Sequence, residues 1–216
     1  MGNRQFKKHG LNMKISKTPL ITLRQFEKIS QIIRAIINVE NGDETRSCIV
    51  FAAIGTHILR RVFKLDAKAV LGKAVYALPS SGIIAYHDIS PSTSNFHCWI
   101  EANGWFFDFS SIVFPEITSS MGLPPSQRLM LQKPLSTIST TIPETYDTFS
   151  FYLMPDYSNI STVAEFVNKQ GFIDLCNIAV ELYETPSKRL KSPPIIRNQL
   201  GDEKAAIFRG NIQGVW

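Results

Sequence analysis

The chain has 216 residues, of which 44% are hydrophobic and 19% charged, and its formal net charge is +5. This composition is typical of one ordinary soluble globular domain, and no stretch approaches the run of about 18 apolar residues that a membrane-spanning helix needs. Residues 1–17 hold five basic residues and no acid, while the remaining 18 basic and 18 acidic residues cancel. We therefore predict a flexible basic leader over residues 1–19 and a neutral single domain over residues 20–216, which disfavours nucleic acid as a partner.

The first elements of the domain follow from hydrophobic periodicity. Apolar residues at helical spacing predict a helix over residues 22–39, with Thr22 as its N-cap. A segment that is apolar almost all round, residues 49–61, predicts a buried helix that starts close to Cys48. Residues 67–78 are rich in Ala, Val and Tyr, which favours a strand, and the Ser/Pro/Gly-rich residues 79–95 predict a loop.

A β-hairpin is predicted next, over residues 96–110. Asn103-Gly104 is a strong signal for a two-residue turn, because a type I′ turn needs positive φ at both central positions. Such a turn sets Ala102 opposite Trp105. Side chains alternate along each strand, so four of them lie on one face of the hairpin: His97, Trp99, Asp108 and Ser110.

His97 and Asp108 become diagonal neighbours across this hairpin, within reach of each other. A carboxylate beside an imidazole fixes the tautomer of the ring and stabilises its protonated form. The pair therefore has the form of a general base with its orienting group. Trp99 and Trp105 are interpreted as packing residues.

Signals in the second half of the chain are weaker. A loop is expected over residues 115–125, and Pro186 begins a basic connector over residues 186–194. Strands are expected over 128–135 and 149–154, and helices over 163–167 and 172–183 with an interruption at Gly171. No element is predicted for residues 201–216.

Cys48 is the candidate nucleophile. A thiol attacks as the thiolate, which a helix N-terminus and a nearby imidazolium both stabilise. Ala52 and Gly55 follow on about the same helical face, where small side chains would let the His97 strand approach. The alternative is an inert core cysteine, because Cys is among the most buried residue types. Free backbone N–H groups near the helix start could receive an oxyanion, with Asn41 or Thr45 as a weaker side-chain guess.

The other cysteines and histidines have structural interpretations. Cys98 alternates to the face opposite His97 and is expected in the core. Three widely spaced cysteines, the third being Cys176, argue against a disulfide framework and for a reducing, cytoplasmic compartment. His57 is expected to be structural and His87 to be solvated in its loop. No His/Cys cluster has zinc-ligand spacing, so neither a metal nor an organic cofactor is expected.

The order of these elements resembles the transglutaminase-like branch of the papain-like cysteine enzymes. The resemblance covers residues 20–155 and rests on the helix that follows Cys48, on Leu71-Gly72-Lys73-Ala74-Val75 and on Phe96-His97-Cys98-Trp99-Ile100-Glu101. Small bacterial members, including leader-cleaving proteins of lasso peptide maturation, carry a similar His-x-Trp-x-Glu segment, and the whole chain resembles an uncharacterised bacterial family of this type. It departs in having Cys98 where relatives often have Ala, and in lacking a Gln shortly before Cys48.

The resemblance implies an α+β fold in which a buried central helix packs on an antiparallel sheet. It also implies a thiol-dependent hydrolase or acyltransferase acting on an amide or peptide-type bond through Cys48, His97 and Asp108. A peptide or isopeptide is the first choice of substrate, followed by a small acyl compound. The alternative function is a catalytically silent binding module on the same fold, and a third is nucleic-acid binding by the leader. The substrate, the choice between hydrolysis and transfer, and the oligomeric state are left open.

Overall fold

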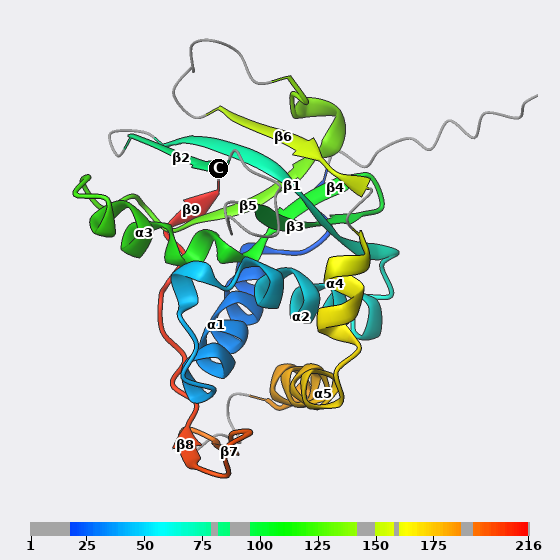
Figure 1. The fold of residues 1–216 in the computed structure, drawn as a ribbon, viewed down its shortest axis with the longest axis vertical. Coiled ribbons are helices and arrows are strands. Elements are labelled where there is room, and N and C mark those ends of the chain that lie inside the picture. The colour runs from blue at the N-terminus through cyan, green and yellow to red at the C-terminus, as the bar shows by residue number, and fades with distance from the viewer. Residues whose placement is uncertain are drawn as a thin grey trace, which may run out of the picture.

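The computed structural model describes residues 18–78, 82–86, 96–141, 150–157, 160–186 and 192–215. It is a mixed α+β fold in which a sheet forms one layer and helices gather on one side of it (Figure 1). The main helices of that layer are α1 (Leu23–Val39), α2 (Cys48–Arg61), α4 (Ile160–Val167) and α5 (Gln170–Glu184).

Helix α1 forms where the periodicity predicted it. Its start is fixed by a capping box, in which the Thr22 hydroxyl accepts from the Gln25 N–H and the Gln25 side chain accepts from the Thr22 N–H. Its apolar face, which includes Phe26, Ile29 and Ile33, is fully buried. The predicted N-cap and the predicted end of this helix are both confirmed.

Helix α2 is the central helix of the layer, and Cys48 is its first residue. Phe51, Ile54 and Ile58 are buried among side chains of α1, α5 and the sheet. The N-cap Ser47 makes no capping hydrogen bond, because its hydroxyl donates to the carbonyl of Asp43 instead. The first N–H groups of α2 are therefore not capped by a side chain.

Seven strands form the main sheet, in the order β2-β1-β3-β4-β5-β9, with β6 paired to β1. All pairings are antiparallel except that of β5 with β9. The strands are β1 (Ala67–Leu78), β2 (Gly82–Tyr86), β3 (His97–Ala102), β4 (Trp105–Asp108), β5 (Leu129–Pro134), β6 (Phe151–Pro155) and β9 (Gly214–Val215). A separate hairpin of β7 (Ile195–Arg197) and β8 (Glu203–Ala205) lies at the far end of the helices from the sheet (Figure 1). Short helical segments complete the described chain: η1 (Glu44–Arg46), η2 (Phe109–Val113), α3 (Phe114–Ser120) and η3 (Leu135–Thr137).

The two faces of the sheet bury separate apolar clusters. Cys98, Ile100 and Phe107 pack into the larger cluster with the helices. Trp99 and Phe106, their neighbours in sequence, pack into a smaller cluster on the opposite face. This alternation is the one predicted for the hairpin.

Three local predictions are wrong. The loop expected over residues 79–95 contains strand β2, with residues 79–81 and 87–95 outside the described part of the chain. The loop expected over 115–125 begins as helix α3, in which Pro115 occupies the first turn, where a missing N–H costs nothing. The break between α4 and α5 falls at residues 168–169, so Gly171 lies inside α5.

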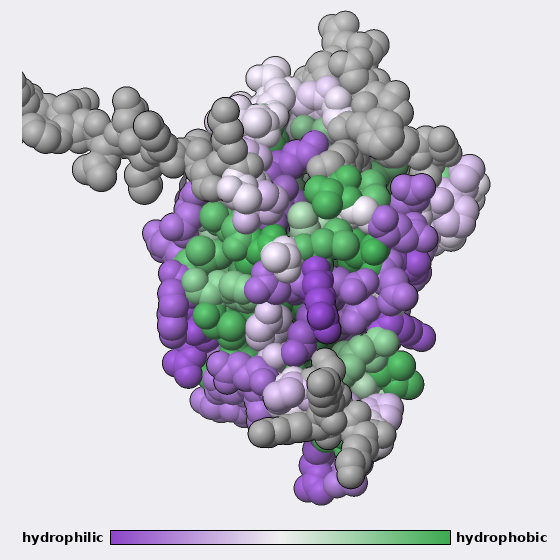
Figure 2. Space-filling model, turned by 180° about the vertical axis from the view of Figure 1, so that it is seen from behind, coloured by the Kyte–Doolittle hydropathy of each residue, from purple (hydrophilic) through white to green (hydrophobic). Residues whose placement is uncertain are grey.

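The described residues test only some of the predictions made from composition. The division into a leader over 1–19 and a domain over 20–216 stays a prediction, because residues 1–17 lie outside the described part, as do 187–191 of the connector. None of the helices described is long and apolar enough to cross a membrane. The rear face carries hydrophobic patches separated by hydrophilic residues (Figure 2). Scattered apolar exposure of that kind is normal for a folded protein.

Candidate active site

The β3–β4 hairpin brings His97 and Asp108 together. Asn103 and Gly104 have φ values of 49° and 79°, as a type I′ turn requires. Ala102 pairs with Trp105, the predicted register. In this register Nε2 of His97 lies 2.8 Å from Oδ2 of Asp108, and both side chains are 1% exposed. The predicted diagonal pairing is confirmed.

Asp108 is held by four hydrogen bonds. Its Oδ2 accepts from His97 and from the Tyr76 hydroxyl, each at 2.8 Å. Its Oδ1 accepts from the backbone N–H of Ser110 at 2.9 Å and from the Ser110 hydroxyl at 2.6 Å. An ionised carboxylate offers about four acceptor sites, so each is filled. Burial would raise the pKa of Asp108, but these partners, His97 foremost, hold it below its ordinary value of 3.8.

Tyr76 was missed at the sequence level. It lies in β1, where Gly72 pairs with His97 of β3, and the strand period of two puts Gly72 and Tyr76 on the same face. The inter-strand register between β1 and β3 is what brings Tyr76 to Asp108, and no local motif encodes it. Burial, followed by the Asp108 carboxylate, raises the pKa of Tyr76 well above its ordinary value. The hydroxyl therefore remains protonated and donates.

The ring of His97 is enclosed by aromatic side chains. Tyr86 of β2 stacks on it, with ring centroids 4.6 Å apart and planes at 24°. Tyr76 meets it edge-on at 5.5 Å. Burial alone would lower the pKa of His97, but Asp108 and then Cys48 raise it from 6.5 to about 10. The net effect of these groups favours the protonated form of the ring.

Nδ1 of His97 is the ring nitrogen that Asp108 does not occupy. Asp108 occupies Nε2, and Nδ1 is buried without a hydrogen-bond partner of ordinary geometry among the described residues. The Cys48 thiol is nonetheless close enough to contribute to the raised pKa of His97. It is half-buried, and its Sγ lies 4.0 Å from the carbonyl oxygen of Phe96, the residue before His97.

Small residues on α2 allow this approach. A Cβ on Gly55 would lie 2.5 Å from the Phe109 ring and 2.8 Å from Cδ1 of Ile100. Real side chains do not tolerate such distances, so only glycine lets α2 lie this close to the sheet at that point. Ala52, one turn before Gly55, is also buried there. The close approach of the His97 strand is confirmed at Gly55, and for Ala52 it stays a prediction.

The side chains guessed as oxyanion donors are engaged elsewhere, which corrects that prediction. Asn41 accepts a hydrogen bond from Lys204 of β8, at the end of the molecule remote from the sheet (Figure 1). The Thr45 hydroxyl donates to Asp43 at 2.7 Å. Both residues precede Cys48 in sequence, but η1 and the end of α1 turn their side chains to other partners. The uncapped N–H groups at the start of α2 are the donors that remain near Cys48.

The other cysteines differ from Cys48. All three are free thiols, and Cys98 and Cys176 are buried. Burial raises the pKa of Cys98 well above its ordinary value and that of Cys176 to about 12. Among the described residues, no three His, Cys, Asp or Glu side chains gather as metal ligands would. His87 lies outside the described part of the chain.

Comparison with known proteins identifies a family. A family model for proteins of unknown function, DUF2026, matches residues 22–216. The chain belongs to the DUF2026 family. No curated protein matches it. A crystal structure described as "genomics APC5867" is similar over 93% of this chain and 99% of its own, with a TM-score of 0.76 and 23% sequence identity. At that identity the likeness shows the shared fold alone.

The arrangement in this DUF2026 protein has the parts of an activated nucleophile. A thiol at a helix start, an imidazole beside it and a carboxylate behind the imidazole are the three groups that nucleophilic catalysis by cysteine needs. The carboxylate is fixed by Tyr76 and Ser110, and the ring by Tyr86. Such a set can accept a proton from the thiol and return it to a leaving group.

Proposed function

We propose that this protein is a thiol-dependent hydrolase or acyltransferase that acts on an amide or peptide-type bond, with Cys48 as nucleophile. The observation that carries the proposal is the buried chain from Asp108 to His97, whose remaining nitrogen is left for the thiol of Cys48. A buried histidine whose pKa is strongly shifted by a specific charged neighbour is a candidate for a functional site. On this proposal the fold is a papain-like, transglutaminase-like one, in keeping with the central helix and the antiparallel sheet.

The reaction would proceed through a thioester. Sγ of Cys48 attacks the acyl carbon while its proton resides on Nδ1 of His97. Collapse of the tetrahedral intermediate breaks the C–N bond, and His97 gives that proton to the departing amine. Water or a second amine then attacks the thioester and loses a proton to His97, and the C–S bond breaks to restore the thiol. Asp108 accepts from Nε2 throughout and stays ionised.

The negative oxygen of the intermediate needs donors near Cys48. The uncapped backbone N–H groups at the start of α2 supply them, and the helix dipole adds a positive potential there. No side chain has to contribute on this account. Loss of Asn41 should therefore leave the reaction unchanged.

The direct test is formation of an acyl adduct on Cys48. We would incubate the full chain with p-nitrophenyl acetate, an activated ester, and locate the acetyl group by mass spectrometry of peptides. The proposal expects a single acetyl group on Cys48, no such adduct in the Cys48→Ala protein, and slower acetylation of Cys48 in His97→Ala. An incubation with cell extract, searched for longer acyl groups on Cys48, would then point to the substrate.

A catalytically silent binding module is the other outcome of this test. Acetylation that is no faster at Cys48 than at Cys98 or Cys176, with His97→Ala without effect, would exclude the enzyme and favour that module. The enclosure of His97 under Tyr86 is compatible with either outcome. Cys48, in contrast, is only half-buried, so we expect its thiol to be within reach of a small ester.

A further inference from the structure

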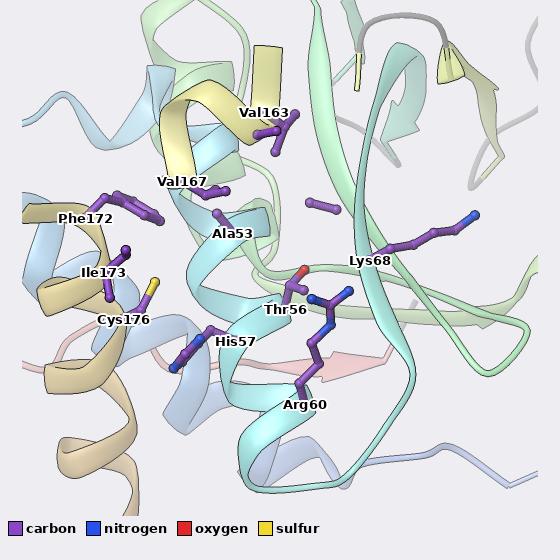
Figure 3. Close-up of a pocket in the computed structure, with 12 residues that line it drawn as sticks. Ala53, Thr56, His57, Arg60, Lys68, Val163, Val167, Phe172, Ile173 and Cys176 are labelled. Carbon is purple, nitrogen blue, oxygen red and sulfur yellow. The ribbon is translucent and has the colours of Figure 1, made fainter. Parts of the chain in front are cut away.

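A cavity of about 350 Å³ lies between α2, α4, α5 and β1 (Figure 3). Its size is in the range of small-ligand pockets, roughly 300–1,000 Å³. Helices α4 and α5 supply an apolar wall, and Figure 3 shows these side chains facing α2 across the cavity. The wall consists mainly of Val163, Val167, Phe172 and Ile173, with Ala53 opposite.

Two polar atoms on the α2 side of this cavity are buried without a partner among the described residues. They are the hydroxyl oxygen of Thr56, whose residue is 8% exposed, and Nε2 of His57. Burial, and then the nearby Arg61 and Arg60, lower the pKa of His57, so its ring is neutral at pH 7. A buried polar group without a hydrogen bond is destabilising. Both atoms are therefore candidates for contact with a ligand.

Arg60 gives the cavity a positive charge. Its Nε donates to the carbonyl of Ala67 at 2.5 Å, which fixes the side chain, and Figure 3 shows the guanidinium extending along the cavity beside Thr56. No acidic side chain lines the cavity, and the terminal guanidinium nitrogens have no carboxylate partner in the described part of the chain. Lys68 contributes its stem only, because its amine points away from the cavity and pairs with Glu101 at 3.1 Å.

The cavity is separate from the candidate active site. Thr56 follows Cys48 by eight residues in α2, about 12 Å along the helix axis at 1.5 Å per residue. Ala52 and Gly55 carry the face of α2 that packs on the sheet, whereas Thr56, His57 and Arg60 face the cavity. A ligand here need not touch Cys48, so the inference below does not depend on the proposed function.

We propose that this cavity binds a small apolar carboxylic acid. The apolar body of the ligand fills the space among the α4 and α5 side chains, and its carboxylate pairs with Arg60 and accepts from the Thr56 hydroxyl. His57 lies on the side of α2 that faces α5, apart from Thr56 and Arg60 (Figure 3), and we assign it no contact with the carboxylate. A free fatty acid and the C-terminal residue of an apolar peptide share this chemistry.

Calorimetric titration of the full chain tests the inference. Octanoate represents a fatty acid, N-acetyl-leucine represents a peptide C-terminus, and 1-octanol is the uncharged control. We expect one of the two acids to bind saturably with a dissociation constant below about 1 mM, and octanol to bind at least about tenfold more weakly. The acid that binds better identifies the source of the ligand.

Matched variants locate the binding. Arg60→Gln should weaken binding of the acid about tenfold or more. Arg61→Gln should not, because Arg61 is equally exposed but does not line the cavity. Thr56→Val should weaken binding while leaving the melting temperature of the free protein unchanged or higher, because it removes an unsatisfied hydroxyl. Ala164→Phe should block the cavity.

Three results would overturn the inference. They are the absence of saturable binding by either acid, equal binding of octanol, and equal losses in Arg60→Gln and Arg61→Gln. The last would mean that general surface charge, and not this cavity, attracts the acid. A Thr56→Val protein that melts lower than the wild type and binds the acid normally would show that the hydroxyl has a structural role only, and it would remove Thr56 from the site.

Discussion

The hydroxyl of Tyr76 donates to Oδ2 of Asp108, the same oxygen that accepts from His97. Both bonds are 2.8 Å long and both are buried. Tyr76 therefore acts on the imidazole through the carboxylate. It comes from β1, whereas Asp108 ends β4, so the site depends on the middle of the sheet as well as on one hairpin.

Tyr76→Phe should lower both stability and activity. It removes a hydrogen bond to a buried charge, for which a loss of about 1.5–3 kcal/mol in the free energy of unfolding is expected. The acetylation rate of Cys48 should fall, because Asp108 is held less firmly. Urea unfolding and the ester assay measure the two effects. Tyr157→Phe is the control, since Tyr157 is exposed and its hydroxyl makes only a 3.4 Å contact with Glu101. Equal effects of the two changes would contradict the role given to Tyr76.

Asp108→Asn should reduce turnover by about 10²–10⁴-fold, by comparison with the same change in a serine-protease triad. The amide keeps the size of the carboxylate but has only one oxygen, so it cannot accept from all of His97, Tyr76 and Ser110. The imidazole then loses its fixed tautomer and its stabilising charge. Steady-state kinetics would measure the loss, with circular dichroism to verify folding. Full activity in this variant would remove Asp108 from the mechanism.

The stability of the protein should fall as pH rises through about 10. The pKa of His97 is raised from 6.5 to about 10 in the folded state. The contribution of His97 to the free energy of unfolding is therefore complete below about pH 6.5. It is lost progressively as the pH rises and the imidazolium of the folded protein gives up its proton. The pKa of Asp108 is lowered, so its contribution to stability has the opposite pH dependence and is lost as the pH falls below its ordinary pKa of 3.8.

Urea unfolding of the wild type and of His97→Gln over about pH 6–10 isolates the contribution of His97 to stability. Lysines and tyrosines titrate in both proteins, so only the difference between them is informative. The difference should shrink toward alkaline pH. A difference that stays constant across the range would mean that His97 is not protonated in the folded protein.

The local parts of this fold were predictable, because the signals for them are local. The Thr22 cap, the buried helix after Cys48 and the Asn103-Gly104 turn each depend on residues close in sequence. The turn alone fixes the register of the hairpin, and hence the contact between His97 and Asp108. Two of the candidate site residues could therefore be paired without any structure.

The parts that were missed depend on contacts distant in sequence. Tyr76 reaches Asp108 only through the pairing of β1 with β3, which no nearby residue specifies. Asn41 looked close to Cys48 along the chain, yet its partner Lys204 lies 163 residues away. Strand β2 is flanked in sequence by Ser, Pro and Gly residues, which are typical of a loop. Its pairing with β1 overrides this local preference for a loop.

The three thiols should react in a fixed order. Cys48 is only half-buried, whereas Cys98 and Cys176 are buried and have raised pKa values. Iodoacetamide at about pH 6 should therefore label Cys48 first and leave the other two protected until the protein unfolds. Peptide mass spectrometry over time gives the order. Cys98→Ala should keep the ester reaction and Cys48→Ala should lose it. Rapid labelling of Cys98 with Cys48 silent is the result that the catalytic proposal could not accommodate.

Gly55→Ala should destabilise the protein and slow the reaction of Cys48. Alanine is a better helix former than glycine by about 1 kcal/mol, but its Cβ would lie 2.5 Å from the Phe109 ring. Both that ring and Ile100 are fully buried, so relief requires α2 to move away from the sheet. Overpacking of this kind costs about 1–3 kcal/mol, which exceeds the gain in propensity.

Gly171→Ala is the matched control for this substitution. It lies in α5, and its Cβ would meet only the end of the flexible Gln199 side chain, at 2.9 Å. That side chain can move, so the gain in helix propensity should leave stability unchanged or slightly higher. Thermal unfolding and the acetylation rate of Cys48 should both be measured. A Gly55→Ala protein as stable and as reactive as Gly171→Ala would mean that the close approach of α2 to the sheet is not needed to set Cys48 beside His97.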